Sequence, residues 1–203
     1  HVTLLLERLL TDGSSPLFSA RGVGGTPASF VLDADALNWI AKRGGLPDPF
    51  PRQRAVLTPH AGELARLMRG SRADMLSDPI RYATRAASEF DQTVIFKTGY
   101  SIAATPDRRA YLAPRAAPEL ATAGTGDVLA GLVGGLLAQG LAPDPAARAA
   151  LFIGSLAGRA AMVQRGIHGV LARDVIEAIP TIMRALVEPM WSSGDWDYKR
   201  EEL

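Results

Sequence analysis

Residues 121–131 read Ala-Thr-Ala-Gly-Thr-Gly-Asp-Val-Leu-Ala-Gly, a glycine-rich loop that runs directly into an apolar helix. Gly124 and Gly126 lack the Cβ atoms that would keep a ligand away from the backbone. The free N–H groups and the positive dipole end of the helix point back at the loop, which makes it a binding site for an anion such as phosphate. The rest of the chain is organised around this stretch.

Asp127 is the informative residue of the loop, because a carboxylate beside a phosphate is repulsive unless it has a task. It would either accept a proton from an attacking hydroxyl or bind a cation. The alternative is a structural role as a capping or first-turn acid, which the helix dipole also favours.

The composition indicates one globular domain that acts on a small molecule. The chain has 203 residues, of which 47% are hydrophobic, and 22 basic residues are balanced by 21 acidic ones. The basic residues are scattered, so we expect neither a nucleic-acid partner nor a membrane. The chain has no cysteine, which excludes disulfides and thiolate chemistry. It has only three histidines, so a histidine-rich metal site is not expected. No signal-peptide pattern opens the sequence, so we expect a cytoplasmic protein.

Polar residues follow three short apolar runs that are typical of buried strands. Residues 29–33 end in Asp33, with Asp35 two residues later. Open α/β sheets bind ligands at the carboxyl ends of their strands, so both acids are candidate site residues. The alternative is one solvent-facing acid and one helix cap.

The next two runs, residues 55–58 and 93–96, lead to His60 with Glu63 and to Lys97. His60 and Glu63 lie on a turn that enters a helix, where such a pair is more often a cap than a catalytic pair. Lys97 leaves a buried strand and could neutralise a phosphate, whereas an isolated lysine is usually a solvated surface residue. Glu63 could hold Mg²⁺ through water.

Strands and helices alternate, which predicts an α/β fold with a mainly parallel sheet covered by helices on both faces. Residues 101–104 and 110–113 interrupt the alternation as an antiparallel hairpin. The expected helices cover residues 3–10, 33–41, 63–68, 78–90, 126–141, 143–163 and 171–187, the last interrupted at Pro180.

Three further expectations concern packing in these helices. In the helix over 78–90, Ile80, Ala83, Ala87 and Phe90 should point inward. The run from residue 128 to 141 should be a buried core helix. Gly154 and Gly158, four residues apart, should allow close packing of their helix against a neighbouring element.

The domain should cover residues 1–189, and the charged residues 190–203 should form a tail.

Several nucleotide-binding motifs are absent from the sequence. No P-loop signature occurs, and the third glycine of a dinucleotide-binding loop is replaced by Leu129. No nucleophile elbow of the hydrolase type is present.

Residues 31–38, 57–63 and 121–131, in this order and spacing, resemble the ADP/ATP-dependent NAD(P)H-hydrate dehydratase family of the ribokinase-like superfamily. The resemblance covers about residues 30–179. It implies a ribokinase-like three-layer α/β/α sandwich and repair of a nicotinamide cofactor. The hydrated cofactor (6S)-NAD(P)HX would be dehydrated to NAD(P)H with ADP or ATP as co-substrate and Mg²⁺ as cofactor.

The resemblance also implies roles for single residues. Asp127 would deprotonate the hydroxyl of the hydrate, which is phosphorylated and then lost as phosphate. Backbone N–H groups of the loop would form the anion hole, and Gly126 and Lys97 would contact the nucleotide. Gly124, Thr125 and Gly126 would form the anion hole. His60, Asp33 and Asp35 would line the substrate side, and Glu63 would hold the water shell of the magnesium ion.

The sequence departs from the family pattern at both sides of the central motifs. The first strand and glycine-rich loop of the family are absent before His1, so we expect an N-terminally incomplete domain. Lys97-Thr98-Gly99 replaces the usual Lys-Gly, and residues 115–118 replace a Gly-Asn-Pro-like turn. A separate N-terminal segment, an epimerase domain or a second copy in a homo-oligomer are the partners that the resemblance suggests.

Two other functions stay open at this stage. A ribokinase-like kinase for a vitamin precursor would share the fold, although such kinases tend to have asparagine at the position of His60. A non-catalytic nucleotide-binding module is the second alternative, because of the missing N-terminal part.

Overall fold

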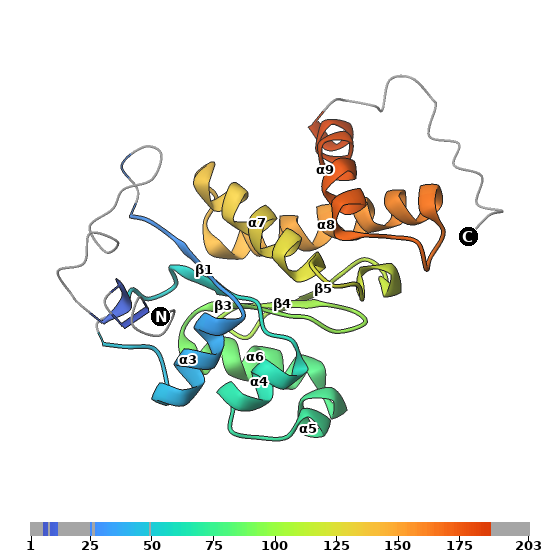
Figure 1. The fold of residues 1–203 in the computed structure, drawn as a ribbon. Coiled ribbons are helices and arrows are strands. Elements are labelled where there is room, and N and C mark those ends of the chain that lie inside the picture. Colours follow the sequence, from blue (N-terminus) through green and yellow to red (C-terminus); the bar gives the residue numbers. More distant parts are fainter. Residues whose placement is uncertain (1–5, 8, 12–24, 26, 49, 188–203) are drawn as a thin grey trace.

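The computed structural model describes residues 6–7, 9–11, 25, 27–48 and 50–187. Five strands form one sheet in the order β1-β2-β3-β4-β5 (Figure 1). They are β1 (Phe30–Leu32), β2 (Ala55–Leu57), β3 (Thr93–Phe96), β4 (Ile102–Ala104) and β5 (Ala110–Leu112). The helices are α3 (Asp35–Arg43), α4 (Ala61–Leu67), α5 (Arg72–Ser77), α6 (Pro79–Phe90), the 3₁₀ helix η2 (Pro118–Leu120), α7 (Thr125–Ala138), α8 (Pro143–Arg165) and α9 (Ala172–Val187).

The sheet is mixed, as the α/β prediction with a central hairpin requires. Strands β1, β2 and β3 are parallel, and Leu32, Leu57 and Val94 lie in register across them. Strands β4 and β5 continue the sheet as an antiparallel meander. The carboxyl ends of the three parallel strands therefore lie along one edge, which is where the sequence places its polar residues.

Alternating side chains of each inner strand enter two separate cores. In β3, Val94 and Phe96 belong to the core under α3, α4 and α6, whereas Ile95 belongs to the core under α7 and α8. All three are fully buried. This two-sided burial of a period-two pattern produces the three layers, helices, sheet and helices, that Figure 1 shows.

Helix α9 extends the upper helical layer (Figure 1). A third core joins it to α7 and α8 through Ala157, Ala161, Val170 and Val175. Gly158 packs closely, as expected, because a Cβ there would lie 2.7 Å from Leu120 Cδ2.

Helix α8 is long and apolar enough to cross a membrane, with a mean hydropathy of 1.3 over its most apolar 18 residues. Half of that window is buried inside the protein, and the helix packs against β2, β3 and β4. Its apolar character is therefore accounted for by the core.

Several packing predictions were wrong. Ile80 is 45% exposed, and Tyr82 rather than Ile80 packs against the core beside the half-buried Phe90. Pro79 is the first residue of α6, so Ile80 lies in the first turn, which is exposed at this position. A Cβ at Gly154 would meet nothing within 4 Å, because this part of α8 faces a cavity.

Helix α9 was expected to break at Pro180 but continues through it. The ring removes the N–H that would bond the Ile176 carbonyl. Ile176 is 54% exposed, so water can satisfy that carbonyl and the helix survives.

Helix α7 begins at Thr125, as the glycine loop predicts, but it is not a buried core helix. Within it only Val133 and Leu136 are buried. One face packs on β1 and α8, and the opposite face lines a cavity toward α9. Helices α5 and η2 were not predicted, and η2 lies between β5 and the glycine loop.

The expected helix over residues 3–10 falls partly outside the described residues, and residues 6–7 and 9–10 are helical. The expected tail over residues 190–203 lies outside the described residues.

Candidate functional site

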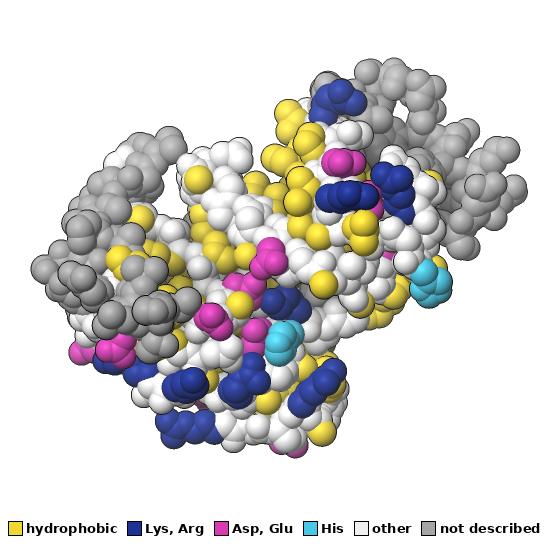
Figure 2. All heavy atoms as spheres, in the orientation of Figure 1, with side chains coloured by type: hydrophobic (Ala, Val, Ile, Leu, Met, Phe, Trp, Pro, Cys, Tyr) yellow, Lys and Arg dark blue, Asp and Glu magenta, His cyan; other side chains and the backbone are white. Residues whose placement is uncertain are grey.

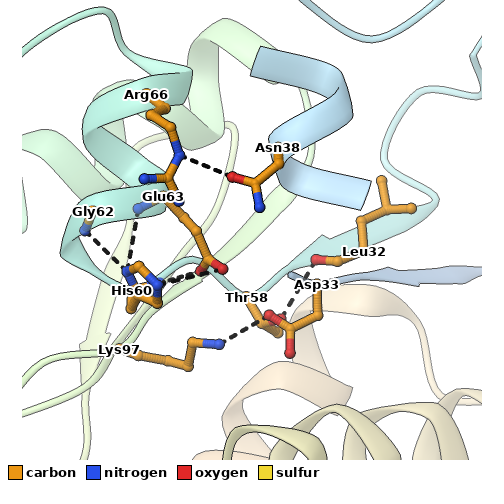
Figure 3. A network of polar contacts seen from close by, with 9 residues as sticks. All are labelled: Leu32, Asp33, Asn38, Thr58, His60, Gly62, Glu63, Arg66 and Lys97. Carbon is orange, nitrogen blue, oxygen red and sulfur yellow. Dashed lines mark hydrogen bonds and ion pairs between the residues drawn. The ribbon is translucent and has the colours of Figure 1, made fainter. Parts of the chain in front are cut away.

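The carboxyl ends of β1, β2 and β3 bring Asp33, His60 and Lys97 together (Figure 3). Lys97 Nζ lies 2.9 Å from Asp33 Oδ1, and the two side chains are 22% and 16% exposed. The backbone N–H of Lys97 donates to the carbonyl of Pro59 at 2.8 Å, which extends the pairing of β2 and β3 by one bridge. Lys97 is thus a half-buried, paired cation, and its alternative role as a solvated surface residue is wrong.

His60 and Glu63 form a capping box at the start of α4. His60 Nδ1 accepts hydrogen bonds from the N–H groups of Gly62 and Glu63 at 3.0 and 3.2 Å. Glu63 Oε2 accepts from the His60 N–H at 2.9 Å, and Glu63 Oε1 lies 3.5 Å from His60 Nε2. The structural alternative for this pair is therefore confirmed, and the box also fixes where the imidazole edge points.

The capping box leaves a half-exposed imidazole beside a buried carboxylate. The His60 side chain is 54% exposed and that of Glu63 only 7%. Because Nδ1 accepts hydrogen bonds, Nε2 is the nitrogen that carries the proton of the neutral ring. This Nε2 lies 3.5 Å from Glu63 Oε1, while Glu63 Oε2 holds the backbone N–H of His60.

Asp35 does not join this group. It lies exposed in the first turn of α3 and makes none of the described polar contacts. The N-cap of helix α3 is Ala34, and no side chain caps the helix, so the alternative that one of the acids caps it is wrong. The neighbouring Asn38 accepts a hydrogen bond from Arg66 at 2.8 Å and ties α3 to α4.

Gly124 is the N-cap of α7, with a φ of 88° that a side chain would strain. A Cβ on Gly126 would lie 3.5 Å from Lys97 Nζ, so the lysine ammonium faces the bare backbone of the first turn. Among the described contacts, none engages the N–H groups of Gly124 and Gly126. The Thr125 N–H already donates to the Thr122 carbonyl at 3.3 Å. Of the three predicted anion-hole residues, Thr125 thus has its N–H already engaged, whereas Gly124 and Gly126 do not among the described contacts.

Two cavities meet at the first turn of α7. The larger, of about 620 Å³, lies between α7 and α9 and is lined by Gly124, Asp127 and a mainly apolar wall. The smaller, of about 310 Å³, lies between α7, α8 and the sheet edge and is lined by Thr125, Gly126 and Lys97. Asp127 is exposed toward the first cavity, while the lysine lines the second. Asp127 and Lys97 thus line two different cavities that adjoin the first turn of α7.

A third cavity, of about 480 Å³, opens on the other side of Lys97 and is lined by His60, Arg72 and Leu76. The space-filling view shows acidic, basic and histidine side chains together at the centre of this face, between the two helical layers (Figure 2). Lys97 lines both this cavity and the 310 Å³ one, so it lies between them.

The 310 Å³ cavity contains polar residues that the sequence did not single out as site residues. Arg115 forms a two-point ion pair with Glu119, whose side chain is fully buried. Ser155 lies on the α8 wall of the same cavity. The i to i+4 spacing of Arg115 and Glu119 was the only sequence signal available, because Ser155 sits in a run that reads as plain core.

The donor set suits a hydrated cation. No group of three His, Asp or Glu side chains that could hold a metal occurs within the described part of the chain. Glu63 uses its oxygens in the capping box, and Asp33 is paired with Lys97. A magnesium ion bound through water and ligand oxygens fits these residues, whereas a cage of protein ligands does not.

Comparison with protein families places residues 20–181 in a family model described as NAD(P)H-hydrate dehydratase. A bifunctional NAD(P)H-hydrate repair enzyme from Moorella thermoacetica is 39% identical over 160 residues, which cover 78% of this chain and 30% of that protein.

Two solved structures show the same fold. The ADP/ATP-dependent NAD(P)H-hydrate dehydratase from Bacillus subtilis, co-crystallised with ATP and Mg²⁺ and soaked with CoA, has a TM-score of 0.69 and 25% identity, and covers 79% of this chain and 57% of its own. A ribokinase-like superfamily protein from Enterococcus faecalis has a TM-score of 0.67 and 23% identity, over 80% of this chain and 55% of its own. The chain thus spans 30% of the repair enzyme and somewhat more than half of the two solved structures.

Proposed function

The chain belongs to the NAD(P)H-hydrate dehydratase family, and from this membership we propose that it takes part in nicotinamide cofactor repair. The reaction is the dehydration of (6S)-NAD(P)HX to NAD(P)H, driven by ADP or ATP. The observation that carries the proposal is the first turn of α7. There Asp127 faces a cavity of about 620 Å³ on one side, and Gly126 faces Lys97 in a cavity of about 310 Å³ on the other. A base and an anion site on two sides of one turn suit transfer of a phosphoryl group between two ligands.

The hydrate binds on the Asp127 side in this proposal, and the nucleotide binds on the Lys97 side. Asp127 accepts the proton of the hydrate hydroxyl while the oxygen of that hydroxyl bonds to the terminal phosphorus of the nucleotide. The bond from that phosphorus to the leaving nucleotide oxygen breaks, so ATP leaves as ADP, or ADP leaves as AMP. The N–H groups of Gly124 and Gly126 hold the charge on the transferring group.

Phosphorylation makes the hydroxyl a leaving group. In the second step the carbon–oxygen bond breaks, phosphate departs with the bonding electrons, and a proton leaves the adjacent ring carbon. The new double bond restores the reduced nicotinamide. His60 and Asp33 contact the substrate at the edge of the sheet, and Asp35 lies at the margin of this region.

Mg²⁺ neutralises nucleotide phosphate oxygens when bound, and Glu63 would hold its water shell. The buried position of Glu63 and its bond to the His60 N–H keep the carboxylate oriented for that task. Lys97 contacts the phosphates directly. To do so, Lys97 breaks its ion pair with Asp33 and forms one with the nucleotide phosphates.

The surroundings of the reaction are also part of the proposal. The bifunctional relatives suggest that an epimerase domain, or a separate N-terminal segment, works together with a chain of this kind. The protein acts in the cytoplasm, where its cofactor substrate is formed, and a homo-oligomer would supply a second copy of the same surface.

The first experiment measures the return of reduced-nicotinamide absorbance when the purified protein meets NADHX, Mg²⁺ and either ADP or ATP. We expect turnover by the native protein and a loss of about 10²- to 10⁴-fold in kcat for Asp127→Asn, because the general base is removed. Asp48→Asn is the matched control. Asp48 is an exposed acid between α3 and β2 that lines none of the described cavities.

Equal turnover by native protein and Asp127→Asn would contradict the role of Asp127. A native protein that is inactive with both nucleotides would contradict the dehydratase proposal. Accumulation of a stable phosphorylated small molecule, without return of NADH, would favour a kinase of the same superfamily.

A further inference from the structure

Arg72 is a basic residue without a partner in the first turn of α5. It directly follows Ser71, the N-cap of this helix. Asp74, the acid of the same turn, accepts hydrogen bonds from the N–H and the hydroxyl of Ser71 at 2.9 and 2.7 Å. Among the described contacts, the Arg72 side chain makes no hydrogen bond or ion pair. Its charge therefore has no structural task that these contacts show.

The side chain of Arg72 borders the cavity of about 480 Å³ on the far side of Lys97. Its described lining includes His60, Lys97 and Leu76 but neither an aspartate nor a glutamate. Lys97 shares its charge with Asp33, so Arg72 is the unshared cation of this lining. A cavity of this size with a basic lining suits an anionic group on an organic ligand.

The position of Arg72 at this cavity is fixed by the packing of α5. Met75 is 1% exposed and belongs to the core under α3, α4 and α6, so it anchors the helix. Arg72 and Leu76 are four residues apart and lie on the same side of α5, which borders the cavity. The helix thus presents a long cation and an apolar side chain together.

The proposed function decides which ligand reaches this cavity. It places the nucleotide phosphates at Lys97 and Gly126, in the 310 Å³ cavity on the other side of the lysine. It places the hydrated ring at Asp127 and brings the dinucleotide past Asp33 and His60, at the ends of neighbouring strands (Figure 3). Because His60 also lines the 480 Å³ cavity, the phosphate-bearing part of the dinucleotide extends into it.

We propose that the Arg72 guanidinium binds a phosphate group in this cavity, and that this phosphate belongs to the dinucleotide substrate. The inference rests on the proposed function and adds a residue that determines affinity for the substrate. A guanidinium binds phosphate through paired, charge-assisted hydrogen bonds. NADPHX carries one phosphate more than NADHX, on the adenosine ribose. A contact of Arg72 with that phosphate favours NADPHX, whereas a contact with the shared diphosphate favours neither form.

The test measures steady-state rates of Arg72→Gln and of the native protein with NADPHX and with NADHX. We expect KM for NADPHX to rise about 5- to 30-fold, the effect of one charge-assisted contact, and kcat to stay within about 2-fold. A rise for NADPHX alone assigns the contact to the ribose phosphate, and an equal rise for both substrates assigns it to the diphosphate. Arg72→Lys, which keeps the charge but not the planar fork, should recover part of the affinity.

The matched control is Arg81→Gln. Arg81 is an exposed arginine in the first turn of α6, and it lines none of the described cavities. Its substitution should leave KM for both substrates unchanged. The melting temperature of Arg72→Gln should equal that of the native protein within about 1 °C, because substitutions of exposed, unpaired side chains change stability little.

Binding measurements make the test independent of catalysis. Calorimetric titration should show a higher Kd of Arg72→Gln for NADPH, or for both NADPH and NADH, and a Kd for ADP within about 2-fold of the native value. A protein that turns over neither hydrate but loses dinucleotide affinity in this way would refute the dehydratase and keep the contact of Arg72.

Unchanged KM and Kd values for both dinucleotides in Arg72→Gln would overturn the inference. A loss of affinity confined to ADP would also overturn it, since the phosphate would then belong to the nucleotide. A similar loss of all three ligands together with a lower melting temperature would assign Arg72 a structural role instead.

Discussion

Single residues show how one side chain serves fold and site together. The His60–Glu63 pair satisfies three backbone N–H groups at the start of α4, those of His60, Gly62 and Glu63, and the same bonds fix the position of the imidazole. A helix cap and a ligand contact therefore do not compete at this position. The structural interpretation of the sequence pattern is confirmed, and the substrate contact of His60 stays a prediction.

Asp174 is the residue for which the structure sets a pH dependence. The Leu171 N–H, at 2.9 Å, and next the Arg165 guanidinium, at 3.1 Å, lower the pKa of this 6% exposed carboxyl, and burial opposes them. A carboxyl whose pKa is lower in the folded state stabilises the protein above its usual pKa of 3.8. That contribution is lost as the pH falls through the lower, folded value.

We therefore expect Asp174→Asn to melt at a lower temperature than the native protein at neutral pH, and the gap to narrow below about pH 4. The measurement is a series of thermal melts of both proteins from neutral to acidic pH, with Asp48→Asn as the exposed control. A gap of constant size over this range would show that the charge of Asp174 does not contribute.

At the level of elements, α8 both packs against η2 and lines the 310 Å³ cavity. Gly158 faces Leu120 and Glu119 of η2, where a Cβ would lie 2.7 Å from Leu120 Cδ2 and 3.0 Å from Glu119 Oε1. Gly154, one turn earlier, faces the 310 Å³ cavity and has open space around it. Two glycines of the same helix thus have opposite reasons to lack a side chain.

Alanine substitutions separate the two reasons. We expect Gly158→Ala to destabilise the protein by about 1–3 kcal/mol, because the added methyl group overpacks the contact with η2. Gly154→Ala should instead be neutral or stabilising by up to about 1 kcal/mol, through helix propensity. Urea unfolding of the two variants measures this, and equal effects at both positions would contradict the packing difference.

At the scale of the whole molecule, the sheet order decides which charges meet. Asp33 follows β1 and Lys97 follows β3, 64 residues later, yet their side chains lie 2.9 Å apart across the end of β2. This ion pair already occupies the ammonium group of Lys97. In the proposed function, Asp33 therefore competes with the nucleotide for the ammonium group of Lys97.

This competition predicts a double-mutant result. Asp33→Asn should tighten ADP binding about 2- to 5-fold, since it frees Lys97 from an ion pair worth up to about 1 kcal/mol. In the Lys97→Met background the same change should have a smaller effect, because no ammonium is released. ADP titration of the four proteins gives the coupling, and an equal effect of Asp33→Asn in both backgrounds would exclude it.

The sequence alone determined the layers of the fold and the positions of the candidate site residues. Strand periodicity, turn residues and the glycine loop at Gly124 are local signals, and the physics that they report acts over a few residues. This is why the strands, the start of α7 and the order of Asp33, His60 and Lys97 along one sheet edge could be predicted. The resemblance of three motifs to one family added the chemistry.

Only the tertiary structure decided how these residues pair and which cavity each of them faces. The contact of Lys97 with Asp33, and the placement of Asp127 and Lys97 in two different cavities, depend on strand order and helix packing over long sequence separations. Ser155 reads as core because its neighbours Leu151 and Ala157 are core, and only the packed structure shows that its buried hydroxyl has no hydrogen-bond partner. Burial and hydrogen bonding are properties of the whole packed chain, so no local pattern could have contained them.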